Sequence, residues 1–182
     1  PRAGTEVRIV DERNKPVAAG QVGELQGRAP SCSSGYYRDP KSTLKAWTYD
    51  GWLPLGDLAR WDDSENLILV GRKSDLIIRG GQNIEPLEIE NYLLAHPKVK
   101  QAAVVGMPDP VMGEKLCAYV VPQTGGSPTL DEIVSFLERK KIAPYKLPER
   151  LEIVESLPMV SETKVNRRIL ALDIADKPIK GP

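Results

Sequence analysis

Short apolar runs, separated by polar and small residues, dominate the first part of the chain. Residues 6–10, 22–27 and 66–70 alternate partly between apolar and polar side chains and are flanked by Gly and Asn, which is typical of β-strands joined by turns. Pro40 favours a short helix over residues 40–47, because a first helical turn does not need the N–H that proline lacks. These patterns predict a β-rich first part with one short helix.

Helical spacing appears further along the chain. Residues 86–95 can place Ile89, Tyr92 and Leu93 on one face, which predicts an amphipathic helix that begins at a proline. A proline directly after His96 ends this helix. His96, the only histidine, is therefore expected to have a cap or surface role rather than a catalytic one.

Two apolar runs that follow are expected to pair in one sheet. Residues 102–106 and 116–121 have the length and composition of strands, and a Pro108-Asp109-Pro110 turn is predicted between them. Residues 151–154 predict a further strand.

The second helix has a clearer start than the first. Thr129 stands three residues before Glu132, the spacing of a capping box in which each residue satisfies a backbone N–H of the other. Apolar residues then follow at helical spacing, namely Ile133, Val134 and Leu137. Pro144 is expected to stop this helix.

Residues 165–174 predict a last helix, with Ile169 and Leu172 facing inward. The order of elements predicts an α+β fold: a β-rich tail followed by a small α+β module whose short sheets are flanked by helices. Charged and small residues interrupt the apolar pattern at residues 73–75, where we place the boundary.

Composition excludes several classes of function. The 182 residues include 25 basic and 25 acidic side chains, so no broad electrostatic field attracts nucleic acid or anionic lipid. Cys32 and Cys117 lie far apart, without zinc or redox spacing, and are expected to be buried free thiols; no metal site is predicted. No apolar run approaches the roughly 20 residues of a membrane span, and the first residues lack signal-peptide features. We therefore expect a cytoplasmic protein.

Two charged residues are candidates for nucleotide binding. Asp57, at the end of an expected Leu55-Gly56-Asp57 turn, can accept hydrogen bonds from both hydroxyls of a ribose; alternatively, it caps that turn. Arg72 follows the strand over residues 66–70, and its planar guanidinium can pair with ribose or phosphate oxygens; alternatively, it forms a surface salt bridge.

A lysine and a glycine pair complete the set of candidates. Lys164 lies in a polar loop that leads into the last helix, and its flexible side chain can deliver positive charge to a phosphate. Alternatively, Lys164 is an ordinary surface residue, and Glu162 is near enough in sequence to neutralise its charge. Gly80-Gly81 lacks side chains and permits close approach of the backbone to a ligand, or it is a plain hairpin turn.

Three segments resemble motifs of the adenylate-forming superfamily: GWLPLGDLARW, GRKSDLIIRGGQNIEP and LPMVSETKVNRRIL. The resemblance covers nearly the whole chain, and the motifs occur in the expected order. It implies that Asp57 holds the ribose hydroxyls, that Arg72 contacts the nucleotide, and that Lys164 acts on the α-phosphate and the attacking carboxylate. The chain departs from the usual motifs at Leu55, where Thr is common, and at Thr163, where Gly is common.

The resemblance also implies a hinge and a thiol side. By position the hinge residue is Ser74, where many relatives have Asp or Lys, and Asp75 is the neighbouring acid that orients the joint. The Gly80-Gly81 loop corresponds to one that borders the pantetheine tunnel during thiol transfer. Asn83 stands where acyl-CoA synthetases can carry a residue that contacts a phosphate of coenzyme A.

The implied protein is the C-terminal portion of an ATP-dependent acid–thiol ligase that forms an acyl-adenylate and then an acyl-CoA thioester. Residues 1–73 would end the large adenylation domain, and residues 74–182 would form the mobile C-terminal domain. Expected ligands are ATP or AMP with Mg²⁺, a carboxylic acid, and coenzyme A or a carrier-protein pantetheine. The segments IENYLLAHP, APYKLPERLEIVESLP and KVNRR are similar both to aryl-acid AMP ligases and to medium- and long-chain acyl-CoA synthetases.

The chain lacks the Ser/Thr/Gly-rich loop, ending in Lys, that binds the β- and γ-phosphates. We therefore expect it to be inactive alone and to need the N-terminal domain of the same enzyme as its partner. Alternatives are an aryl-acid AMP ligase that loads a carrier protein, and a non-catalytic adaptor surface for a partner protein.

Overall fold

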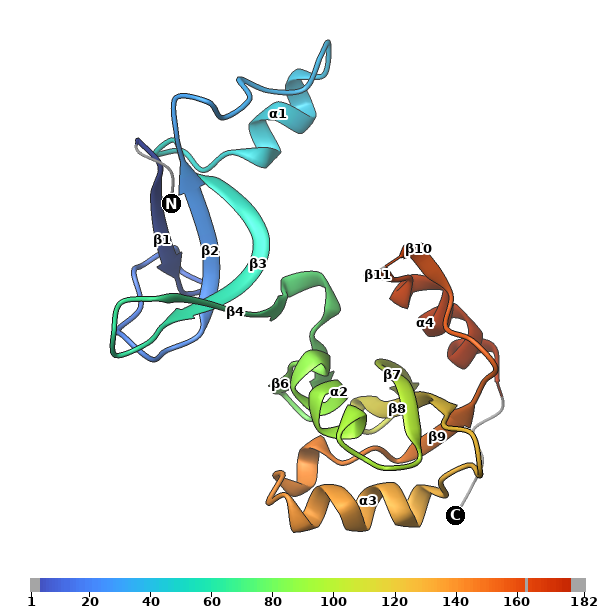
Figure 1. The fold of residues 1–182 in the computed structure, drawn as a ribbon. Helices are drawn as coiled ribbons and strands as arrows, with labels where there is room; N and C mark the ends of the chain where they lie inside the picture. Colours follow the sequence, from blue (N-terminus) through green and yellow to red (C-terminus); the bar gives the residue numbers. More distant parts are fainter. Residues whose placement is uncertain (1–3, 163, 178–182) are drawn as a thin grey trace. The chain divides into compact units, whose positions relative to one another are not determined.

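The computed structural model describes residues 4–162 and 164–177, and the chain forms two compact units, Pro1–Ser74 and Asp75–Pro182. Each unit has its own sheet (Figure 1). Each also has its own apolar core. The predicted α+β class is confirmed, because strands and helices occur together and the second unit has helices packed on a sheet.

The first unit is a four-stranded antiparallel sheet whose strands lie in chain order. Its strands are β1 (Glu6–Val10), β2 (Gly23–Arg28), β3 (Leu53–Trp61) and β4 (Leu67–Arg72), with helix α1 (Pro40–Ala46) between β2 and β3. The predicted strand over residues 6–10 and the predicted short helix are confirmed. The core of this sheet is small, and α1 buries none of its residues.

The expected turn at Leu55-Gly56-Asp57 is wrong, since all three residues lie inside β3. Gly56 adopts φ +72°, a backbone conformation that is open to glycine, and a β-bulge follows between Leu58 and Ala59. These irregularities bend the strand without ending its hydrogen bonding. The Gly56-Asp57 pair therefore predicted a turn, whereas in the structure it lies in an irregular part of strand β3.

The second unit is built on the long antiparallel pair β7 (Val99–Asp109) and β8 (Gly113–Pro122), as predicted for the two apolar runs. Strand β8 also pairs in parallel with β9 (Arg150–Ile153) and, at one end, with β5 (Ile77–Arg79). Strand β6 (Gln82–Ile84) extends the sheet beyond β5. The turn between β7 and β8 lies at residues 110–112, two residues later than expected, because Pro108 and Asp109 still belong to β7.

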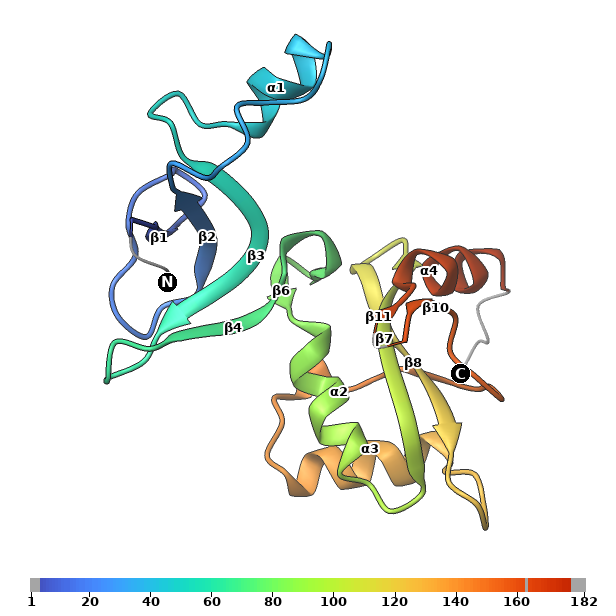
Figure 2. The same cartoon turned by 45° about the horizontal axis from the view of Figure 1, so that its top comes forward.

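Helices cover both faces of this sheet (Figures 1 and 2). Helices α2 (Pro86–Leu94) and α3 (Leu130–Arg139) pack on one face, and α4 (Arg167–Asp176) packs on the other. Alternate residues of β7 and β8 enter the two cores. The residues toward α2 and α3 are Ala102, Val104, Leu116, Ala118 and Val120, and those toward α4 are Ala103, Val105, Cys117, Tyr119 and Val121. Because both faces are buried, these strands are apolar almost throughout.

The capping box at the start of α3 is confirmed. Thr129 Oγ1 accepts a hydrogen bond from the Glu132 backbone N at 3.2 Å, and Glu132 Oε2 accepts one from the Thr129 backbone N at 3.0 Å. The expected stop at Pro144 is wrong, because α3 ends at Arg139 and Pro144 begins a short 3₁₀ turn, η2 (Pro144–Lys146). Lys141, at φ +60°, leaves the helical path before the proline is reached.

The expected inward face of the last helix is wrong. Ile169 and Leu172 are 50% and 60% exposed, whereas Leu170 and Ile174 are buried against the sheet. The side chain of Asn166 accepts a hydrogen bond from the Ile169 backbone N at 3.4 Å, so the helix begins at Arg167 rather than at residue 165. Residues four apart, not three apart, form its apolar face.

The histidine and the cysteines differ in part from expectation. His96 is buried rather than at the surface; its ring packs edge-on against Phe136, and burial lowers its pKa. Cys117 is a buried free thiol as expected, and desolvation raises its pKa to about 12. Cys32 is also free but only partly buried.

Asp109 gives the turn between β7 and β8 a dependence on pH. The Lys115 ammonium, 2.7 Å from Oδ2, and backbone N–H groups of Met112 and Val111 hold its pKa at about 2. Because the folded state lowers this pKa, the carboxylate stabilises the fold above about pH 4, the range of an unperturbed Asp, and this contribution disappears as pH falls toward 2.

We therefore expect Asp109→Asn to lower the unfolding temperature at pH 6 and to match the unsubstituted chain near pH 2. Thermal unfolding by circular dichroism across this range checks the prediction. Asp176→Asn, at an exposed carboxylate of the same unit, is the matched control. A deficit for Asp109→Asn that stays constant down to pH 2 would contradict the assignment.

Candidate functional site

Asp57 and Arg72, the two residues predicted to bind nucleotide, lie directly opposite each other on β3 and β4. Arg72 Nε lies 3.0 Å from Asp57 Oδ1, and the side chains are 51% and 25% exposed. A pair this exposed contributes only about 0–1 kcal/mol to stability. The guanidinium has five N–H donors and the carboxylate two acceptor oxygens, so both groups keep hydrogen-bonding capacity for a ligand. This donor and acceptor set fits a ribose with its phosphate.

The register of β3 and β4 brings this pair together. Arg72 ends β4 directly after Gly71, which lies opposite Leu58, and the bulge beyond Leu58 shifts the register by one residue. Without that shift, Asp57 would lie opposite a different residue of β4. The surface salt bridge considered for Arg72 therefore exists. Its partner is Asp57, the other residue predicted to bind the nucleotide.

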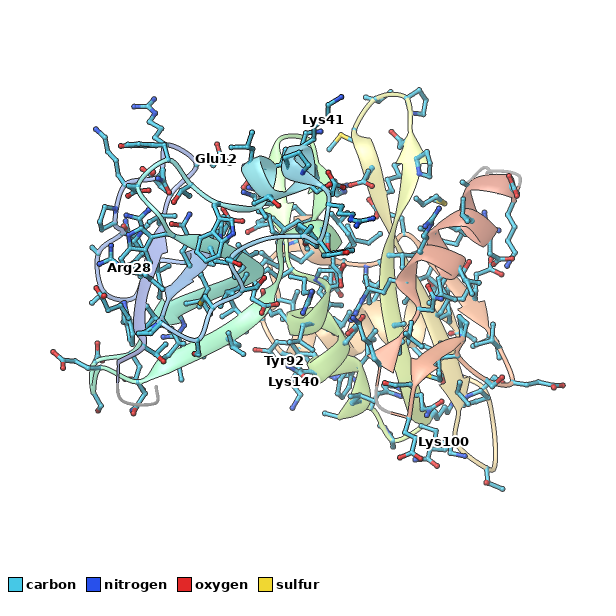
Figure 3. All side chains as sticks on the ribbon, turned by 90° about the horizontal axis from the view of Figure 1, so that it is seen from above. Glu12, Arg28, Lys41, Tyr92, Lys100 and Lys140 are labelled. Carbon is cyan, nitrogen blue, oxygen red and sulfur yellow. The ribbon has the colours of Figure 1, made fainter. Side chains whose placement is uncertain are left out.

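A stacked tryptophan holds the start of β3. The guanidinium groups of Arg8 and Arg28 lie 4.5 and 4.6 Å from the centre of the Trp52 ring (Figure 3 labels Arg28). Arg8 also pairs with Asp50 at 2.8 Å, and Arg28 pairs with Glu6 at 2.7 Å. Cation–π contacts of this kind favour the stacking of the two guanidinium groups on the ring. No sequence motif marks this cluster, although Arg28 and Glu6 face each other in the β1–β2 register.

Ser74 and Asp75, the predicted hinge residues, lie in a 3₁₀ turn, η1 (Lys73–Asp75), where the first unit ends and the second begins. Asp75 Oδ2 lies 3.3 Å from Arg167 Nη1 at the start of α4. Arg167 Nη2 in turn lies 2.6 Å from Glu90 Oε2 on α2. Nothing local in the segment KVNRR indicates that Arg167 has two acidic partners.

Gly80 and Gly81 form the turn of the hairpin between β5 and β6, with φ +55° and +80°. Positive φ at both central residues is the requirement of a type I′ turn, which glycine meets without strain. The Gly80 backbone N donates to the Met112 carbonyl at 2.8 Å, and a Cβ on Gly80 would lie 2.8 Å from Met112 Cε. The two glycines therefore form a hairpin turn. Asn83 lies in β6 and is exposed.

Lys164 lies in a short hairpin, within the polar segment that leads into the last helix. Strand β11 (Lys164–Val165) pairs with β10 (Met159–Ser161), and Lys164 lies opposite Ser161. The side chain of Lys164 is exposed and makes no hydrogen bond or ion pair with any residue that the structure describes, Glu162 included. Thr163, one of the departures from the family motif, lies outside the described residues. The lysine is thus available to a ligand.

Other kinds of site find no support in the described part of the chain. Over residues 4–162 and 164–177, no group of three or more His, Cys, Asp or Glu residues is arranged to hold a metal ion. Over the same residues, no helix is long and apolar enough to cross a membrane.

Residues 88–164 match the family model of the AMP-binding enzyme C-terminal domain. The match includes α2, the central sheet, α3 and the hairpin that carries Lys164. Residues 88–164 therefore carry the C-terminal domain of AMP-binding enzymes.

Individual relatives extend the likeness over nearly the whole chain. It is 41% identical to the medium-chain fatty-acid–CoA ligase of Escherichia coli (strain K12), over 94% of this chain and 31% of that protein. It is 36% identical to the 2,3-dihydroxybenzoate–AMP ligase of Bacillus subtilis (strain 168), over 97% of this chain and 32% of that protein. ATP-bound MatB from Rhodopseudomonas palustris matches with a TM-score of 0.89 at 31% identity, over 95% of this chain and 34% of that one. The chain thus spans about a third of the length of these relatives.

Proposed function

We propose that this chain is the C-terminal portion of an ATP-dependent ligase that joins a carboxylic acid to AMP and then to a thiol. Residues 1–73 end its large adenylation domain, and residues 74–182 form its mobile C-terminal domain. The observation that carries the proposal is the Asp57–Arg72 pair, a carboxylate and a guanidinium placed side by side in a chain whose relatives include an AMP ligase and a CoA ligase.

The nucleotide is held from the first unit in this proposal. Asp57 accepts hydrogen bonds from the ribose hydroxyls, and Arg72 donates to ribose or phosphate oxygens. The described residues offer no group of carboxylates for Mg²⁺, so the ion is expected to accompany the phosphates and to be held outside this chain. The loop for the β- and γ-phosphates is also absent from this sequence, so the 182 residues alone are expected to be inactive.

The reaction has two halves. First, a carboxylate oxygen of the acid attacks the α-phosphorus of ATP, the bond from that phosphorus to the bridging oxygen of the β-phosphate breaks, and pyrophosphate leaves. Lys164 places its positive charge where negative charge develops in this step. Second, the thiol sulfur attacks the acyl carbon, the bond from that carbon to the AMP oxygen breaks, AMP leaves, and the thiol proton passes to solvent.

The thiol half uses the other predicted residues. Rotation at Ser74 and Asp75 exchanges the hairpin of Lys164 for the Gly80-Gly81 hairpin at the reacting centre. The glycine turn gives a pantetheine arm room to approach, and Asn83 contacts a phosphate of coenzyme A. We favour coenzyme A as acceptor because the fatty-acid relative is a CoA ligase. The second candidate is an aryl-acid AMP ligase that loads a carrier protein, favoured by the dihydroxybenzoate relative.

The full-length gene product tests this function by ATP–pyrophosphate exchange across a panel of aliphatic and aromatic acids. Exchange with at least one acid is expected, followed by thioester formation with either coenzyme A or a phosphopantetheinyl carrier protein. The acid and the acceptor with the highest kcat/KM identify the substrate class. Absence of exchange with every acid, in a folded protein that still binds a partner protein, would favour the adaptor alternative.

Asp57→Asn in the full-length enzyme is expected to raise the KM for ATP by about tenfold to 100-fold, because hydrogen bonds to a charged group are worth roughly 1.5–3 kcal/mol. Stability should change little, since the ion pair with Arg72 is exposed. Initial rates of pyrophosphate exchange against ATP concentration measure the effect. Asp63→Asn, at an exposed carboxylate of the same unit, is the control. Equal KM values for the two variants would remove Asp57 from the nucleotide site.

A further inference from the structure

We propose that Arg167 is a positioning residue for Lys164. Its ion pairs connect the base of the hairpin that carries Lys164 to Asp75 at the hinge turn and to Glu90 on α2. In this proposal, the hinge turn and the lysine therefore move together as one rigid body. This inference rests on the proposed role of Lys164 in adenylate formation. It adds a residue that the sequence motifs did not single out.

The guanidinium of Arg167 joins two elements that are distant in sequence. Arg167 Nη1 lies 3.3 Å from Asp75, 92 positions earlier, and Nη2 lies 2.6 Å from Glu90 on α2. Glu90 is buried, and its other oxygen accepts a hydrogen bond from the Val104 backbone N at 2.8 Å. The turn at the hinge, α2 and the central sheet are therefore connected through one side chain.

Arg167 is three residues from Lys164, and the segment between them is ordered. The Asn166 backbone N donates to the Pro158 carbonyl at 2.7 Å, which closes the base of the hairpin, and Val165 packs against the core beside α4. Beyond this base the hairpin is exposed, at Met159, Val160 and Lys164 itself. The lysine therefore takes its position from the base of the hairpin, and Arg167 is the charged contact of that base with the hinge segment and α2.

The chemistry of the contact favours arginine over lysine. A planar guanidinium can reach two carboxylates at once, whereas a single ammonium group is a point charge. Arg167 Nε is buried and has no hydrogen-bond partner among the described residues. A buried donor without a hydrogen-bond partner is unfavourable. The attraction of the guanidinium to the two carboxylates must therefore exceed this cost and determine where the side chain lies. A neutral residue at this position would leave Glu90 as a buried charge without this partner.

The test compares Arg167→Gln with Arg168→Gln in the full-length enzyme, because Arg168 is the adjacent, exposed arginine of the same helix. We expect Arg167→Gln to lower the kcat of pyrophosphate exchange between about tenfold and 100-fold, the usual effect of a displaced reacting group, with little change in the KM for ATP. Arg168→Gln should stay within about twofold of the unsubstituted enzyme. Equal behaviour of the two variants overturns the inference.

A double substitution separates positioning from general damage. If Arg167 acts through Lys164, then Arg167→Gln added to Lys164→Ala should lower exchange by less than about threefold further, because residues that act as a unit are not additive. If the losses of the two single variants multiply in the double variant, the inference about Arg167 is overturned while the proposed function of Lys164 stands. A Lys164→Ala enzyme with unchanged exchange overturns the proposed function of the lysine first, and the inference with it.

A third comparison covers the stability of the buried carboxylate. Glu90→Gln with Arg167→Gln removes both charges, keeps an oxygen that can accept from the Val104 backbone N, and should restore the unfolding temperature without restoring kcat. Hydrogen exchange supplies a readout independent of activity: the Val165 and Asn166 amides should exchange about tenfold faster in Arg167→Gln than in Arg168→Gln. Restored kcat in the double variant, or unchanged protection of these amides, overturns the inference.

Discussion

Lys164→Ala in the full-length enzyme is expected to lower the rate of adenylate formation by about 100- to 1,000-fold, the usual cost of removing one preorganised charge or donor from a reacting centre. The side chain of Lys164 is exposed and makes no ion pair with any described residue, so its loss should hardly affect folding. The expected defect is in kcat, because in the proposed function the charge of Lys164 is needed most when negative charge develops at the α-phosphate.

Two half-reactions measured separately check this prediction. Pyrophosphate exchange reports adenylate formation, and thioester formation from a synthetic acyl-adenylate reports the second half. The first should collapse while the second is spared, because in the proposed function the lysine acts before the adenylate exists. Lys100→Ala removes another exposed lysine of the same unit, labelled in Figure 3, and serves as the control. Equal loss of both halves would refute the assigned role.

Leu93→Ala is expected to have the largest effect on stability. Leu93 is 0% exposed in the core between α2 and the sheet, whereas its neighbour Leu94 is 49% exposed. Truncating a buried leucine costs about 2–5 kcal/mol, from lost transfer energy and the cavity left behind. For a unit of this size, the loss corresponds to a fall in unfolding temperature of at least about 10 °C. Leu94→Ala should change it by no more than about 3 °C.

The positions of the tryptophans allow the unfolding of the two units to be followed separately. All 3 tryptophans lie in the first unit, at positions 47, 52 and 61, whereas Leu93 lies in the second. Because each unit has its own core, Leu93→Ala should lower the transition seen by circular dichroism and leave the tryptophan fluorescence transition in place. A matching shift of both transitions would show that the two units unfold together.

The elements predicted well from sequence are those whose signals are local. The capping box at Thr129 and Glu132, and the proline at the start of α2, specify backbone hydrogen bonding within a few residues. Strand β3 was not predicted, because Gly56 and Asp57 favour turns locally, whereas pairing with β2 and β4 decides the outcome. The face of α4 was wrong for a similar reason, since only packing on the sheet selects Leu170 and Ile174 over Ile169 and Leu172.

The candidate site shows the same limit. Family motifs identified Asp57 and Arg72 one by one, but their ion pair depends on strand register and on a bulge that no motif records. Arg167 was not recognised, because its partners Asp75 and Glu90 are 92 and 77 positions away in sequence. Contacts of that range are products of the folded chain.

The two thiols of the chain differ in a way that is useful for spectroscopy. Thiolates, not thiols, attack maleimides, and burial keeps Cys117 protonated, with a pKa of about 12. Cys32 is partly exposed and lies in the first unit, so one dye can be attached there without engineering the native sequence. A second dye at position 100 of the other unit would then turn the proposed rotation about Ser74 and Asp75 into a change of energy-transfer efficiency, observable in single molecules.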